Sequence, residues 1–201
     1  MIKQRDMEKY TECMEEVKLR QQAIKDMMTS QTYTTYFITN VEFICLQFRK
    51  ILELIAMATL TSNKYHYKEI WKRFYNHYKA REIFKEIEKF NPDFYPVPTR
   101  QVIENGIVKE TVRIDNGYLT KDDFDDVYGK CSSVIHSTNP YNNIPVDIVK
   151  ISEEFVEWNT KITRLLNHHQ VQLYDKDYQL WVLMNSEGNG KVQVNLFKKI
   201  S

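Results

Sequence analysis

The sequence predicts a mainly α-helical fold: a bundle of about five helices with an inserted β-hairpin and a C-terminal antiparallel three-stranded meander. Apolar residues recur at helical spacing over most of residues 1–169. β-branched runs flank an Asn-Gly pair, and the period changes to that of strands after residue 169. We therefore expect a helical domain over 1–169, with the hairpin at about 99–114, and a small meander over 170–201 packed on it.

The segment 41–60, VEFICLQFRKILELIAMATL, is so densely apolar that we expect a central helix covered on several sides. Charged residues recur too often within it for a membrane crossing. Glu53 lies between Leu52 and Leu54, so its carboxylate either reaches solvent or pairs with a cation. Asn40 is expected to cap this helix.

Amphipathic helices are expected on both sides of this segment. In residues 3–29 apolar positions alternate at spacings of three and four. This pattern predicts a long first helix on the core or, alternatively, a dimer seam with Gln21 setting the register. Another helix is expected over 64–90, where cations alternate with Tyr and His. Such a face can bind nucleic acid, although a solvated charged face has the same pattern.

Prolines and turn residues mark the next boundaries. Pro92, Pro96 and Pro98 predict an extended connection after the helix over 64–90. The β-branched runs on either side of Asn105-Gly106 predict a hairpin.

Two further helices precede the meander. Thr120, with Asp123 three residues later, predicts the start of a helix that ends near residue 135. The acidic residues in its first turns suit the helix dipole, and a divalent-metal site has no further spacing signature to support it. Asp147 begins a last helix that we expect to end at residue 169.

Composition narrows the class of protein. Hydrophobic residues make up 42% and charged residues 27%, with only 5 Gly and 5 Pro, which favours a globular, helix-rich chain over a disordered one. Lys plus Arg (28) and Asp plus Glu (27) nearly cancel, so a nucleic-acid contact would need a local basic patch.

Cysteine usage and the N-terminal sequence bear on the compartment. The 3 Cys have no close spacing, so we expect reduced thiols. The N-terminus is charged and lacks a signal-peptide pattern, which favours a cytoplasmic protein. With no zinc motif and no phosphate-binding glycine loop, we expect neither a metal nor a cofactor.

The candidate site lies at the end of the helix that starts after Thr120. His136 stands there in a polar turn, and the reference pKa of histidine, about 6.5, suits proton transfer. Ser132 and Ser133 share its helix face, whereas Lys130 lies six residues back, about 120° around the helix. Lys130 and His136 would converge only if the helix distorts or a second subunit contributes. A histidine at a helix C-terminus also interacts well with the dipole, which is an alternative reason for its position.

A basic residue followed by His on a helix, after helical hairpins, resembles the R-x(4-6)-H motif of the HEPN (higher eukaryotes and prokaryotes nucleotide-binding) superfamily. Here the pair is Lys130 and His136 with five residues between them. The FRKILELIA, NPDFYP and HSTNPY segments also resemble a group of uncharacterised prokaryotic proteins. The resemblance covers roughly residues 1–169.

The resemblance implies a function. Many HEPN proteins are metal-independent endoribonucleases of toxin–antitoxin and abortive-infection (phage defence) systems, and they act as homodimers. By this resemblance, His136 would be the acid or base for attack of a ribose 2′-hydroxyl on the adjacent phosphate, and Lys130 would stabilise the phosphorane. Asn139 and Tyr141 would position phosphate or base, with Ser132 and Ser133 as further binding candidates.

Lys in place of Arg loses the planar bidentate fork. This departure favours an alternative function, a non-catalytic helical module for dimerisation or for binding a protein partner. Phosphate or nucleotide binding without cleavage is a third reading. The expected partners are a second copy of the chain and RNA, or a protein partner, and not a membrane.

Overall fold

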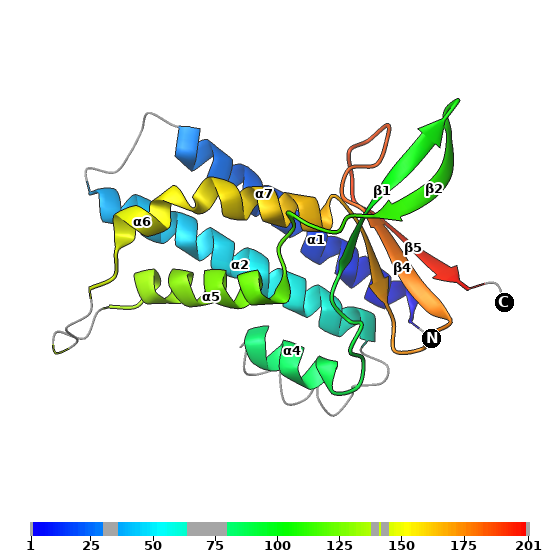
Figure 1. The fold of residues 1–201 in the computed structure, drawn as a ribbon, viewed down its shortest axis with the longest axis horizontal. Helices are drawn as coiled ribbons and strands as arrows, with labels where there is room; N and C mark the ends of the chain where they lie inside the picture. Colours follow the sequence, from blue (N-terminus) through cyan, green and yellow to red (C-terminus); the bar gives the residue numbers. More distant parts are fainter. Residues whose placement is uncertain (1, 30–35, 64–79, 138–140, 142–144, 200–201) are drawn as a thin grey trace.

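The structure is a computed structural model that describes residues 2–29, 36–63, 80–137, 141 and 145–199. Helices lie side by side at one end of the molecule and a β-sheet lies at the other (Figure 1). The helices are α1 (Gln4–Thr29), α2 (Phe37–Asn63), α4 (Ala80–Glu88), α5 (Lys121–Ile135), α6 (Ile148–Glu153) and α7 (Phe155–Leu166).

The predicted fold class, a helical bundle with a separate hairpin and a three-stranded meander, is wrong. In the described part of the chain, the strands form one antiparallel sheet in the order β2-β1-β3-β4-β5. They are β1 (Val97–Glu104), β2 (Ile107–Arg113), β3 (His168–Gln172), β4 (Tyr178–Leu183) and β5 (Gln193–Lys198). The hairpin joins the C-terminal strands because Val97 and Pro98 of β1 pair with Gln170 and His169 of β3. Strands from both sides of the predicted domain boundary therefore share one sheet.

The central helix α2 is buried on most sides, as the sequence predicts. Phe48 at its middle is fully buried, and its ring centroid lies 5.6 Å from that of Phe155 and 5.4 Å from that of Trp158. The predicted cap was wrong, because α2 begins at Phe37 and Asn40 is a buried residue within the helix.

The helix α1 lies on the core, the first of its two predicted alternatives. Its apolar stripe is buried, and Gln21 donates hydrogen bonds to Asn159 (3.0 Å) and Thr163 (2.9 Å) of α7. It also binds the sheet: Tyr10 Oη lies 2.8 Å from His169 Nε2, and the Val192 N–H donates to Glu15 Oε1 at 2.6 Å. Gln21 therefore contacts another helix of the same chain.

The capping box that starts α5 is confirmed. The Asp123 N–H donates to Thr120 Oγ1 at 3.1 Å, and the Thr120 N–H donates to Asp123 Oδ2 at 2.9 Å. Burial raises the pKa of Asp123, but hydrogen bonds from Lys161 and Thr120 outweigh it, so the net pKa is lowered. Asp123 of the acidic first turn is thus accounted for by capping and by one ion pair with Lys161 of α7.

Two other helix predictions need correction. The helix expected to run from Asp147 to residue 169 is divided into α6 and α7, and the strand β3 begins at His168. Of the helix expected over 64–90, only α4 can be described. Most of its predicted basic face, at positions 64–79, lies outside the described residues.

Candidate functional site

His136 is the C-cap of α5, and its backbone N–H donates to the Ser132 carbonyl at 3.1 Å. Its exposed side chain meets α2, which runs beside α5 (Figure 1). Arg49 Nη1 lies 3.3 Å from His136 Nε2 and 3.3 Å from Ser132 Oγ. Because a guanidinium only donates, Nε2 is the acceptor in this contact and the ring proton is assigned to Nδ1.

The Arg49 side chain is held from two sides. Its Nε lies 3.2 Å from Glu53 Oε1, one turn along α2, and its guanidinium carbon lies 5.0 Å from the centre of the Tyr128 ring. Glu53 also pairs with Lys50 at 3.2 Å, so this carboxylate has the cationic partners that the sequence left as one alternative. A guanidinium fixed by a carboxylate and by an aromatic face keeps a defined orientation.

Lys130, the predicted partner of His136, lies elsewhere. Its Nζ is 2.8 Å from Asp126 Oδ2 and 2.6 Å from Glu154 Oε2. Burial lowers the pKa of Lys130, but these two hydrogen bonds outweigh it and the net pKa is raised. The helix α5 stays regular up to Ile135, so Lys130 and His136 point in directions about 120° apart. Within one chain these two residues do not form a pair.

Of the other predicted site residues, some lie beside His136 and others do not. Ser132 joins Arg49 and His136, and its Oγ also donates to the Tyr128 carbonyl at 2.7 Å. Ser133 donates to the Lys130 carbonyl at 2.8 Å. Tyr141 is 90% exposed, and Asn139 lies outside the described residues.

We call Arg49, Ser132 and His136, with Glu53 and Tyr128 as supports, the Arg49–His136 cluster. Arg49 was not among the predicted site residues, because the motif places the cation on the same helix as His136. A usable signal was present: an Arg four residues before a Glu in a helix that is otherwise densely apolar.

The cluster combines a fixed guanidinium, an imidazole and a hydroxyl near the protein surface. The Arg49 side chain is 23% exposed, and its Nη2 has no partner among the described residues. Guanidinium forks bind phosphate oxygens, and an imidazole with an unprotonated Nε2 can accept a proton. The arrangement can therefore hold a phosphate group and move a proton next to it.

No match is found when the chain is compared with protein-family models, with curated proteins and with solved structures. Within the described ranges, no three His, Cys, Asp or Glu side chains group together in a way that could hold a metal ion. The described helices also all fall short of the length or the apolar character that a membrane span requires.

Proposed function

We propose that the Arg49–His136 cluster binds and cleaves RNA without a metal ion, with His136 as acid or base and Arg49, in place of Lys130, as the phosphate-binding cation. The observation that carries this proposal is the contact of 3.3 Å between Arg49 Nη1 and His136 Nε2. An arginine restores the bidentate donor that Lys130 lacks.

The proposed reaction is transfer of the phosphoryl group to the neighbouring 2′-oxygen. His136 Nε2 takes the proton of the 2′-hydroxyl while that oxygen attacks phosphorus, and the bond to the 5′-oxygen breaks. The imidazolium or a water molecule returns a proton to the leaving 5′-oxygen. The products are a 2′,3′-cyclic phosphate and a free 5′-hydroxyl.

The same contact suggests how substrate would enter the cluster. A 2′-hydroxyl that donates to His136 Nε2 takes the place of the Arg49 N–H group. The released N–H then points toward the phosphate, where negative charge grows as the phosphorane forms. Ser132 Oγ lies within reach of the same guanidinium and can hold it during this exchange.

A second candidate function is a non-catalytic module for dimerisation or for partner binding. It is favoured by Phe43 and Leu46, which are 36% and 39% exposed on α2 and precede Arg49 by one to two turns. Contiguous exposed apolar side chains with a polar rim are typical of interaction surfaces, and these two lie about one turn apart on α2. In the first proposal the same residues would support a homodimer.

The biological setting we propose is the one that the HEPN resemblance implies: a cytoplasmic prokaryotic protein of the abortive-infection or toxin type, acting on RNA. In that setting the protein would have to be inactive, or held inactive, until infection. The Arg49–His136 cluster alone would catalyse the cleavage of RNA.

The test is cleavage of a mixed RNA pool in EDTA by the wild type beside His136→Ala. We expect cleavage by the wild type only, with 2′,3′-cyclic phosphate ends, and equal thermal stability of the two proteins because His136 is exposed. If neither protein cleaves, or both cleave equally, the catalytic proposal fails. In that case size-exclusion chromatography with light scattering, on the wild type and on Phe43→Asp, tests the binding module.

A further inference from the structure

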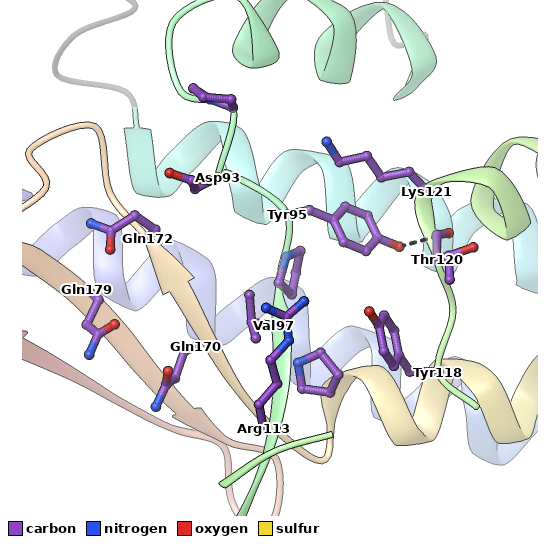
Figure 2. A pocket seen from close by; sticks show the side chains of 13 residues that line it. Asp93, Tyr95, Val97, Arg113, Tyr118, Thr120, Lys121, Gln170, Gln172 and Gln179 are labelled. Carbon is purple, nitrogen blue, oxygen red and sulfur yellow. Dashed lines mark hydrogen bonds between the residues drawn. The ribbon is translucent and has the colours of Figure 1, made fainter. Parts of the chain in front are cut away.

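A cavity lies at the opposite end of α5 from His136. It has a volume of about 440 Å³ and is lined by the segments 92–98, 113–121 and the strands β3 and β4. In Figure 2, the side chains of Gln170, Gln172 and Gln179 lie on one side of Arg113, and those of Tyr118 and Thr120 on the other. Its volume is within the range of small-molecule sites, about 300–1,000 Å³.

The walls of this cavity are fixed before any ligand arrives. Pro92, Pro96 and Pro98 restrict the backbone of one wall. The Tyr95 hydroxyl donates to the carbonyls of Leu119 (2.9 Å) and Thr120 (3.3 Å), which ties that wall to the opposite one (Figure 2). Pre-formed walls lower the ordering cost of binding.

The charges in the cavity are mostly satisfied. Asp93 pairs with Lys176 at 2.9 Å, and a hydrogen bond from Lys176 lowers the pKa of Asp93. Lys121 pairs with Glu88 at 2.6 Å, and in Figure 2 its ammonium points away from Arg113. Arg113 makes no ion pair or hydrogen bond through its guanidinium with any other described residue. The lining therefore offers one uncompensated positive charge.

The glutamines offer neutral hydrogen-bonding groups. Gln172 Nε2 already donates to the Tyr178 carbonyl at 2.9 Å, which leaves its Oε1 as the acceptor that this side chain can offer. Gln179 lies opposite Gln172 in the pairing of β3 with β4. The side-chain amides of Gln170 and Gln179 have no partner in the part of the chain that the structure describes. Each can donate and accept at once.

These features define the ligand. One guanidinium calls for one anionic group, a carboxylate or a phosphate. A side-chain carboxamide can donate to a C=O group and accept from an N–H group on the edge of a flat ring. Glutamine binds the edge of a nucleobase in this way. The ring of Tyr118 and the proline rings supply flat apolar surfaces for packing.

An extended peptide fits this cavity less well. The strand edges at the cavity are partly occupied, because Val97 and Pro98 of β1 pair with Gln170 and His169 of β3 and the Pro98 carbonyl accepts from the Ile114 N–H, which leaves a peptide little edge to extend.

We propose that this cavity binds a small anion with one carboxylate or phosphate and a flat, amide-edged ring, with Arg113 holding the anionic group and Gln170, Gln172 and Gln179 reading the ring edge. Nucleoside monophosphates and heteroaromatic carboxylates such as orotate share this chemistry. The proposal does not depend on RNA cleavage, because the 15 residues of α5 place the cavity roughly 20 Å from His136.

The test is isothermal titration calorimetry of the full chain with uridine monophosphate, adenosine monophosphate and orotate. Benzoate and inorganic phosphate serve as probes that keep the charge and lack the amide edge. We expect Arg113→Gln to weaken binding about 10-fold or more, and Gln179→Leu to weaken it about 3- to 10-fold. The matched control is Arg100→Gln, on the same hairpin and outside the lining, which should leave binding unchanged.

Binding of a nucleotide but not of orotate would show that the anionic group of the ligand is a phosphate. Binding of orotate but of neither nucleotide would show that it is a carboxylate. Unchanged binding in His136→Ala would separate this cavity from the Arg49–His136 cluster. The proposal is wrong if none of the three ring ligands binds in the low millimolar range, if benzoate or phosphate binds as tightly as they do, or if Arg113→Gln binds like the wild type. Tighter binding of an acetylated tripeptide than of any ring ligand would also overturn it, in favour of a peptide site.

Discussion

Arg49 of α2 and His136 of α5 lie 3.3 Å apart, Nη1 to Nε2, although 87 residues separate them in the chain. The contact exists because α2 and α5 pack side by side (Figure 1) and because the Arg49 side chain reaches the last turn of α5, where it contacts Ser132 and His136. This contact replaces the pair of Lys130 and His136 that the sequence motif suggested. The roles of the two cations, Arg49 and Lys130, can therefore be compared by substitution.

The first prediction concerns these two cations. If the cluster cleaves RNA as proposed, Arg49→Lys should lower kcat/KM about 100-fold, because a point charge replaces a bidentate donor at the phosphorane. Lys130→Gln should change it less than about 3-fold, since Lys130 binds Asp126 and Glu154 instead. Initial rates on one RNA substrate measure both. The reverse ranking would return the catalytic role to Lys130.

The second prediction follows from His169, which is fully buried in β3. Its Nδ1–H donates to the Leu166 carbonyl at 2.7 Å and its Nε2 accepts from Tyr10, so the neutral ring is fully bonded. Burial, with a smaller contribution from His168, lowers the pKa of His169 to about 4. In the unfolded chain the ring takes up its proton near pH 6.5.

Between pH 6.5 and about 4 the unfolded state therefore binds one more proton than the native state. The contribution of His169 to the free energy of unfolding is complete above pH 6.5 and falls on acidification, by roughly 3 kcal/mol in all. Urea unfolding at several pH values should show a flatter acid decline for His169→Gln than for the wild type. Equal slopes would mean that His169 does not titrate as its burial requires.

The third prediction tests the capping box of α5. Thr120→Ala should lower the free energy of unfolding by about 1 kcal/mol, because the Asp123 N–H loses its acceptor. Thr160→Ala is the matched control: this exposed hydroxyl only donates back to the Val156 carbonyl within α7. It should stay within about 0.5 kcal/mol of the wild type in thermal unfolding. Equal effects of the two substitutions would contradict the capping role.

The fourth prediction tests the centre of the core. Phe48→Ala should destabilise the protein by about 3–5 kcal/mol, since it leaves a cavity between α2 and α7. Phe37→Ala, the same change at the exposed start of α2, should cost about 1 kcal/mol or less. Denaturant unfolding measures both. A small loss at Phe48 would mean that the neighbouring rings fill the space.

Local signals in the sequence predicted local structure well. Thr120 and Asp123 form the expected capping box. Asn105 and Gly106 have φ values of 52° and 76°, the positive angles that an Asn-Gly hairpin turn requires. Each of these features depends on residues only a few positions apart, so the sequence contains the whole interaction.

Contacts between distant segments were not predictable in this way. The single sheet depends on Val97 meeting Gln170, and no periodicity within either strand specifies its partner. The Arg49–His136 cluster depends in the same manner on the packing of α2 against α5. The motif predicted His136 as a site residue. Its cationic partner lies on another helix, and only the tertiary structure determines which residue that is.

The bonds of α1 to the sheet have a consequence during synthesis on the ribosome. Tyr10 and His169 are 159 residues apart, and Glu15 and Val192 are 177 apart. At about 5–20 residues per second, the nascent α1 waits roughly 8–35 s for its partners to be translated. During that interval the face of α1 that later bonds to α7 and to the sheet stays uncovered, so we expect a chaperone that binds nascent apolar helices to act on it.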